Sequence, residues 1–240
     1  MLGAAWYLAL VDHLNPIQLK ILSTLLFRPG ARFRDLNTDS LGTDHFSYHL
    51  RSCVDLGLVE KDGQTYTLTS KGKMLAGKID TTTHKIEKQP KVSVILIAHK
   101  VINGQKKFLV QQRTKEPYFG YWGCIAGKVK FGETLFETAG RELQEEAGVS
   151  AKFRFCYEIH EMVYAKASRE QLEDKFFHII ECYALDGEIA KKTPEGANLF
   201  VTEAEFRQLK PKYHNEDDLL TWFLNRDFKF KEKKYLIDHF

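Results

Sequence analysis

Cysteine is scarce in this sequence, and its four copies show no spacing that suggests a shared site. Cys53, Cys124, Cys156 and Cys182 stand far apart and include no C-x-x-C pair, which excludes the common zinc-binding spacings. We expect four free thiols in a reducing cytosol, each serving as a small structural residue. The pattern therefore predicts a cytoplasmic protein without disulfides.

Long apolar runs are missing as well. Residues 1–14 are mostly apolar, but they begin without basic residues and are interrupted by Asp12. A signal peptide begins with positive charge and a membrane span needs about 20 apolar residues, so neither is expected. We interpret this stretch as a helix that packs on its own domain or on a second subunit of a homodimer. No membrane partner is expected.

An excess of charge of one sign is the third absence. The 240 residues include 35 Lys and Arg against 32 Asp and Glu, a net charge of +3. This excess is too small to predict a nucleic-acid partner from composition alone. The hydrophobic fraction of 43% and the charged fraction of 28% are typical of a globular protein. The length suits one large domain or two small ones.

The densest pattern lies in residues 127–149, GKVKFGETLFETAGRELQEEAGV. We predict a helix that begins near Glu133 and Thr134 and ends at Gly148, because glycine is favoured just after a helix. Apolar residues recur in it at steps of three and four, which predicts a side that faces a core. These residues are Phe136, Ala139, Leu143 and Ala147.

Three glutamates share one face of this predicted helix. Glu142, Glu145 and Glu146 stand at i, i+3 and i+4, a spacing at which like charges repel one another. Arg141 neutralises only part of that charge. The remainder favours a divalent cation, and an all-oxygen ligand set favours Mg²⁺ or Mn²⁺ over zinc. The alternative is a solvated charged helix, which would not explain why the glutamates adjoin the apolar stripe directly after a glycine loop.

These residues match, at every fixed position, the Nudix box G-x5-E-x7-R-E-U-x-E-E-x-G-U, where U is aliphatic. Seven fixed identities at about 7% usage each give a chance match on the order of 10⁻⁸ per window. The second part of the chain thus resembles the Nudix hydrolases. That resemblance implies an α/β/α sandwich that hydrolyses the pyrophosphate linkage of a nucleoside diphosphate joined to another group.

The resemblance also implies roles for single residues. The metal ligands would be four carboxylates and one backbone carbonyl, namely Glu142, Glu145, Glu146, Glu195 and the carbonyl of Ala126. The catalytic set would be Glu142 and Glu145, with Glu133 as a hydrogen-bond partner and Arg141 holding the glutamates in place. The general base stays open among the box glutamates and a carboxylate on a later loop. Glu181 competes with Glu195, but its place within a strand favours an outward-facing, solvated side chain.

Four residues complete the predicted substrate site. Arg113 resembles a strand-end arginine that meets a phosphate, and Gly127 and Lys128 open the box. Trp122 would stack on a base, although packing is the alternative for an aromatic residue at this place. Many family members have proline and glycine before the box glycine, where this chain has Ile125 and Ala126. ADP-ribose, NADH, nucleoside triphosphates and sugar nucleotides all remain open as substrates.

Residues 1–85 predict a separate domain. Asn15 and Pro16 begin a helix, a short helix covers 33–36, and Thr43 caps a third. Asp62 and Gly63 then mark a β-hairpin. Three helices and a hairpin wing form the winged helix-turn-helix pattern, and residues 45–72 resemble the MarR and ArsR regulators. We therefore expect an α/β protein, with a Nudix α/β/α sandwich over 86–240 preceded by this small winged-helix domain.

In a winged helix-turn-helix domain the third helix enters the major groove of double-stranded DNA. The outward side of this helix offers five residues for DNA contact, which are Thr43, His45, Ser47, Tyr48 and Arg51. Residues 1–85 hold ten Lys and Arg against eight Asp and Glu, a net of +2, whereas DNA-binding domains are usually markedly basic. A winged domain that mediates dimerisation or covers a substrate site is therefore the alternative.

Three functions are compatible with this sequence. The first is a Mg²⁺-dependent Nudix hydrolase, and the second is a transcription regulator that senses a nucleotide in the Nudix fold. The third is an enzyme resembling isopentenyl-diphosphate isomerase, which would need catalytic residues that the sequence does not reveal. The intact glutamate set favours the hydrolase.

Overall fold

The computed structural model describes residues 14–238. The helix predicted within residues 1–14, and with it the packing on a second subunit, lies almost wholly outside the described residues. The chain divides into two compact units between Lys88 and Gln89. Each unit has its own apolar core, so each is described by itself.

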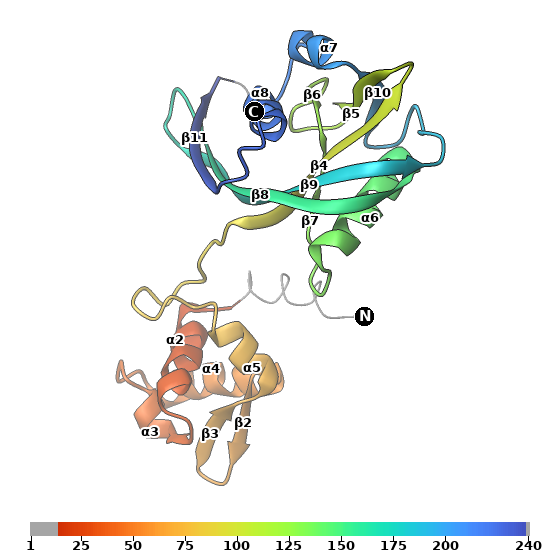
Figure 1. Cartoon of the computed structure of the whole chain (residues 1–240). Helices are drawn as coiled ribbons and strands as arrows, with labels where there is room; N and C mark the ends of the chain where they lie inside the picture. Colours follow the sequence, from red (N-terminus) through yellow and green to blue (C-terminus); the bar gives the residue numbers. More distant parts are fainter. Residues whose placement is uncertain (1–13, 239–240) are drawn as a thin grey trace. The chain divides into compact units, whose positions relative to one another are not determined.

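The first unit combines four described helices with a small sheet (Figure 1). Its helices are α2 (Pro16–Phe27), α3 (Phe33–Leu36), α4 (Thr43–Asp55) and α5 (Ser70–Ala76). Strands β1 (Ala31–Arg32), β2 (Val59–Asp62) and β3 (Thr65–Leu68) form an antiparallel sheet in the order β1-β3-β2. Asn15 caps α2 as predicted. The cap of α4 is Gly42 rather than Thr43, which is the first residue of the helix.

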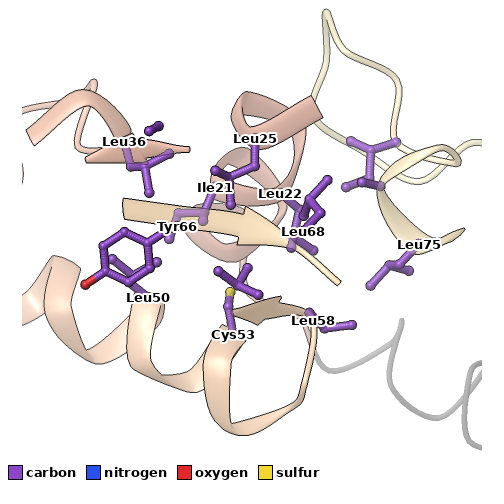
Figure 2. Close-up of a cluster of buried hydrophobic side chains, with 14 of the residues drawn as sticks. Ile21, Leu22, Leu25, Leu36, Leu50, Cys53, Leu58, Tyr66, Leu68 and Leu75 are labelled. Atoms are coloured by element: carbon purple, nitrogen blue, oxygen red, sulfur yellow. The ribbon is translucent and has the colours of Figure 1, made fainter. Parts of the chain in front are cut away.

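The core of the first unit is built from side chains of α2, α4, α5 and the hairpin (Figure 2). Ile21 and Leu25 of α2 meet Leu50 and Cys53 of α4, all of them buried. The unit continues past Asp80, because Ile86 packs on this core and forms an isolated β-bridge with Ile79. Part of the polar stretch 80–90 is therefore ordered against the first unit.

The second unit is organised around one large mixed sheet (Figure 1). Its strands are β4 (Lys91–Ile102), β5 (Gln105–Arg113), β6 (Trp122–Gly123), β7 (Ile125–Lys128), β8 (Ser150–Ala165), β9 (Gln171–Asp186), β10 (Gly196–Val201) and β11 (Lys231–Ile237). The order is β10-β5-β4-β9-β8-β11, with β6 paired to β5 and β7 to β4. The pairs β4–β9 and β8–β11 are parallel.

Helices cover both faces of this sheet. Along β4 the side chains alternate, so that Val94 and Leu96 join the core under α6 (Leu135–Ala147). Ile95 and Ile97 join the opposite core, under α7 (Glu203–Gln208) and α8 (Glu216–Leu224). The unit is therefore an α/β/α sandwich, which confirms the fold class predicted from the sequence. No helix within residues 14–238 is both long and apolar enough to cross a membrane.

Candidate active site

Helix α6 is fixed at both ends by its own sequence. Thr134 is the N-cap, and its hydroxyl accepts from the Glu137 N–H while the Glu137 carboxylate accepts from the Thr134 N–H. Gly148 ends the helix at a φ of 71°, a left-handed conformation that favours glycine. Ala139, Leu143 and Ala147 are fully buried, as predicted.

Phe136 departs from the predicted stripe. Its side chain is 47% exposed and stacks on Phe153 of β8, with ring centroids 6.2 Å apart. In the first turn of α6 it is the neighbouring Leu135 that packs on this core, and the apolar face continues at Ala139.

Strand β7, which precedes α6, packs its backbone against the glutamates of that helix. Gly127 of β7 lies so close to α6 that a Cβ at this position would stand 2.0–2.2 Å from atoms of the Glu142 side chain. Only glycine leaves room for that carboxylate. The neighbouring residue Ala126 lies opposite Ile95 of β4 and lines the same cleft as the glutamates.

Arg141 binds three of the four box carboxylates at once. Its Nε is 2.7 Å from Glu133 Oε1 and its Nη2 is 2.8 Å from Glu133 Oε2. Its Nη1 lies 2.5 Å from Glu142 and 3.2 Å from Glu145. The paired guanidinium lowers the pKa of Glu133 to about 2, and these carboxylates raise the pKa of Arg141 further above its ordinary value.

Glu146 is the box carboxylate that Arg141 does not reach. It is buried, and that burial, together with the charges of Glu142 and Glu195, raises its pKa to about 8. The turn that carries it is held by Asn198 of β10, whose Nδ2 donates to the Glu146 carbonyl at 2.6 Å and to the Ala190 carbonyl at 2.8 Å. Gln111 of β5 in turn donates to Asn198 Oδ1.

A cleft of about 1000 Å³ collects most of the predicted site residues. It is lined by nine of them, namely Arg113, Ala126, Gly127, Lys128, Arg141, Glu142, Glu145, Glu146 and Glu195. Four further lysines add basic side chains to its lining, namely Lys91, Lys115, Lys130 and Lys175. Glu133 and Trp122 do not line it. Glu133 lies behind Arg141, while Trp122 packs against the core under α8.

The two candidates for the distal carboxylate are placed differently. Glu195 lines the cleft and pairs with Lys115. Glu181 is not the solvated residue that its strand position suggested. It is 3% exposed and bound by His99 and Arg154, so its charge is neutralised within the sheet. The expectation of an outward-facing Glu181 was therefore wrong.

Arg113 lines the cleft, and its Nε and Nη2 are engaged by backbone carbonyls. Its Nε lies 2.9 Å from the carbonyl of Lys115 and 2.7 Å from that of Pro117. The side chain therefore holds the loop after β5 in shape. The side chains of Lys128 and Lys130, in contrast, are exposed at the cleft wall. These two cations have fewer backbone partners than Arg113.

Sequence reasoning missed a second group of cleft residues. Glu161 of β8 is bound by His214 and Asn215, and Glu216 begins α8. All four line the cleft. Burial raises the pKa of Glu216 to about 7, although the Cys124 N–H donates to it. In the sequence, the acidic run from Glu216 to Asp218 indicates only a favourable start for a helix. No local signal therefore predicted a site here.

The donor set of the box fits a hard divalent cation. Glu142, Glu145, Glu146 and the Ala126 carbonyl offer oxygen only, the ligand type that Mg²⁺ prefers. Within residues 14–238 no three His, Cys, Asp or Glu side chains stand in metal-binding geometry, and Glu142 and Glu145 are paired with Arg141. Glu146, buried beside two other carboxylates, is short of positive charge.

Helix α4 carries the residues predicted to contact DNA. Thr43, His45, Tyr48 and Arg51 are exposed, and Ser47 is half-buried. Tyr48 is 69% exposed, a large fraction for an aromatic side chain. His45 Nε2 lies 3.2 Å from Nε2 of the buried His49, so the two rings meet on one side of the helix.

Comparison with known proteins shows which family has this α/β/α sandwich with a glutamate cluster beside a glycine strand. The NUDIX domain family matches residues 90–223, and the chain belongs to that family. The NUDIX domain of NrtR from Shewanella oneidensis, complexed with ADP ribose, is similar at a TM-score of 0.51 and 17% identity, over 66% of this chain and 99% of that one. A MutT protein from Bacillus halodurans is similar at a TM-score of 0.52 and 21% identity, over 62% of this chain and 93% of that one. No curated protein matches.

Proposed function

We propose that this protein is a Mg²⁺-dependent Nudix hydrolase that cleaves the pyrophosphate linkage of a nucleoside diphosphate derivative. The observation that carries the proposal is the Arg141-bound glutamate cluster of α6, which faces a large cleft with lysines in its wall. Family membership gives the fold, and the intact cluster supports the proposed chemistry.

Glu142, Glu145, Glu146 and the carbonyl of Ala126 would hold the cation, with Glu195 in the lining of the same cleft. The ion, when bound, supplies charge neutralisation of the diphosphate and a water of lowered pKa. Gly127 keeps the backbone close enough to Glu142 for both to face one ligand. Arg141 positions Glu142 and Glu145 and limits their mutual repulsion.

The lysines of the cleft wall bind the phosphate groups in this proposal. Lys128 and Lys130 follow the glycine, and Lys115 lies by Glu195. A diphosphate placed between these cations and the glutamate-bound ion has its anionic oxygens neutralised from two sides, which lowers the barrier to attack by water. ADP ribose, the ligand of the similar NrtR domain, is one diphosphate derivative to include in tests.

Turnover of a nucleotide panel with Mg²⁺ tests this proposal. Glu145→Gln removes a cleft carboxylate whose side chain is half-exposed, so the fold is expected to survive while hydrolysis falls at least about 100-fold. Glu137→Gln is the matched control on the same helix, because glutamine also serves in a capping box, and it should keep full activity. Tight nucleotide binding without turnover in the unmodified protein would contradict hydrolysis and favour a sensor.

A second role is supported by the surface of α4. We propose that the first unit is a winged helix-turn-helix that binds double-stranded DNA through Thr43, His45, Ser47, Tyr48 and Arg51, with the β2–β3 hairpin as the wing. The supporting observation is that α4 buries one side in its own core and exposes these polar residues, including Tyr48, on the other.

Electrophoretic mobility shifts with double-stranded DNA over a series of salt concentrations test this role. Arg51→Ala should weaken binding and reduce the salt slope by about one. Arg28→Ala, which removes an exposed arginine at the end of α2, is the matched control and should leave binding unchanged. Equal binding by the unmodified protein and Arg51→Ala would leave dimerisation or cleft covering as the role of the domain.

A further inference from the structure

Two histidines face each other on helix α4 of the first unit. His45 and His49 are four residues apart, so their side chains lie on the same side of the helix. Their Nε2 atoms are 3.2 Å from each other. His45 is exposed, whereas His49 is buried, with 6% of its surface exposed. The pair therefore connects the solvent side of α4 with the edge of the core.

The inclination of the two rings differs from that of an in-line hydrogen bond. An in-line N–H···N bond of this length would place the ring centroids about 5.5 Å apart. The centroids are instead 5.0 Å apart, and the ring planes make an angle of 63°. Two imidazole nitrogens at about 2.0–2.1 Å from one tetrahedral cation are about 3.3 Å apart, and their ring centroids are about 5.2 Å apart. The observed separations are close to this second geometry.

The buried histidine of this pair is held in the form that binds metals. Burial and the neighbouring His45 lower the pKa of His49 below its ordinary value, so its ring is neutral at neutral pH. A neutral imidazole has one nitrogen with a free electron pair, which is the form that ligates metals. In the described part of the chain, Nδ1 of His49 is buried without a hydrogen-bond partner. No hydrogen bond of Nδ1 therefore opposes the tautomer that frees Nε2 as a ligand.

The protein supplies two ligands, and water completes the coordination. Cys53 lies four residues beyond His49 in the same row, but its thiol is fully buried, and burial raises its pKa to about 12. The thiol therefore stays protonated and is not a ligand. Within residues 14–238 no third His, Cys, Asp or Glu stands in metal-binding geometry with this pair. Because His45 is exposed, the remaining positions are open to water.

The two imidazoles determine which class of cation fits. Imidazole nitrogen suits Ni²⁺, Cu²⁺ and Zn²⁺, whereas Mg²⁺ and Mn²⁺ prefer carboxylate, carbonyl and water oxygens. We infer that His45 and His49 form a binding site for a divalent transition-metal cation on the outward side of α4. This site differs from the glutamate cluster of α6 in ligand type and in the unit that holds it. It does not depend on hydrolysis or on DNA binding.

Calorimetric titration of the full chain with Ni²⁺ tests this inference. Excess Mg²⁺ is present, so that the carboxylates of the cleft are occupied while imidazole sites stay free. The unmodified protein should show a Ni²⁺ site that His45→Ala weakens at least about tenfold, because even the loss of a hydrogen-bond partner of a metal ligand costs about 10–100-fold. His45 is exposed, so the variant should fold. Equal affinity of the two proteins, or no binding by either, would overturn the inference.

His178→Gln is the matched control for the loss of one histidine. His178 lies on β9 of the second unit and is partly exposed. The control should bind Ni²⁺ as tightly as the unmodified protein does. An equal loss of affinity in His178→Gln and His45→Ala would show scattered binding by separate histidines, which contradicts a paired site.

Paramagnetic line broadening in nuclear magnetic resonance spectra identifies both ligands without a substitution of the buried His49. Ni²⁺ added below one equivalent should broaden the ring signals of His45 and His49 before those of the other histidines. Broadening of the His45 signals alone would mean that a single exposed histidine holds the cation, and the paired site would be rejected.

Discussion

Helices α4 and α6 have the same length, but their polar sides differ in how far they are exposed to solvent. Each has 13 residues and packs an apolar face against the core of its own unit. On α6 the polar side is drawn into ion pairs and partly buried, so that Glu142 and Glu146 lose contact with water. On α4 the corresponding residues Thr43, His45, Tyr48 and Arg51 remain exposed.

This difference supports the two roles proposed above. Gathering carboxylates on α6 costs electrostatic energy, which Arg141 offsets only for Glu133, Glu142 and Glu145. Such an arrangement is expected where a small, highly charged ligand completes the site. The polar side of α4 carries no such cost and suits a large, solvated surface.

Core substitutions should give the largest effects and test whether the two units are independent. Leu50→Ala on α4 and Leu143→Ala on α6 each remove a buried side chain, so each should lower the free energy of unfolding of its own unit by about 2–5 kcal/mol. Calorimetry should show two transitions, of which each variant shifts one. A common shift of both transitions would show that the units unfold together.

The second largest effect is expected from a substitution of Gly127, the glycine that faces Glu142. Gly127→Ala places a methyl group on the Glu142 carboxyl, so hydrolysis should fall about 100-fold, and stability should fall by about 1–3 kcal/mol from overpacking. Gly140→Ala is the control, since its Cβ would meet Phe153 at an ordinary 3.7 Å. It should raise stability by about 0.5–1 kcal/mol. Full activity in Gly127→Ala would mean that Glu142 need not adjoin this strand.

Arg141→Gln should reduce hydrolysis about 10–100-fold and change the pH dependence of stability. The folded pKa of Glu133 is about 2, below its ordinary 4.5, so its ion pair stabilises the protein fully above pH 4.5 and is lost as the pH falls toward 2. The stability difference between the unmodified protein and Arg141→Gln should therefore be constant above about pH 5 and shrink below it. Denaturant titrations across this range measure it. A difference independent of pH would contradict the pairing.

The smallest effect is expected on the outward side of α4. Tyr48→Ala and Arg51→Ala should each change the free energy of unfolding by no more than about 0.5 kcal/mol, because the side chains are exposed. Thermal unfolding of the first unit measures this. A loss above about 1 kcal/mol would show that this side of α4 is buried in solution, as in a dimer, and would remove the contrast with α6.

Local pattern predicted the elements of the site that are contiguous in sequence. The box helix, its end at Gly148 and the shared face of Glu142, Glu145 and Glu146 follow from helical spacing, and the structure has them. The first-unit helices and the Asp62–Gly63 hairpin follow from capping and turn residues in the same way. Such features depend on interactions within a few residues, which a single sequence contains.

The cleft residues Glu161, His214, Asn215 and Glu216 could not be predicted because they meet only through tertiary structure. Glu161 and Asn215 are 54 residues apart and are joined by packing of the segment before α8 on the sheet. The prediction of a solvated Glu181 failed for the same reason, because a strand position does not reveal that His99 and Arg154 lie on neighbouring strands. The alternation of KEKKYLI in residues 231–237 is too weak to show that it pairs in parallel with β8.

The side-chain amide of Asn198 has a mechanical consequence. It links the last turn of α6 to β10 by a hydrogen bond, and Gln111 links the same amide to β5. The three elements are therefore connected by one small hydrogen-bond network. Sliding of the outer strand along β5 would pull Glu146 away from Glu195, or push it closer. The position of Glu146 is thus tied to the register of the edge strand β10 on β5.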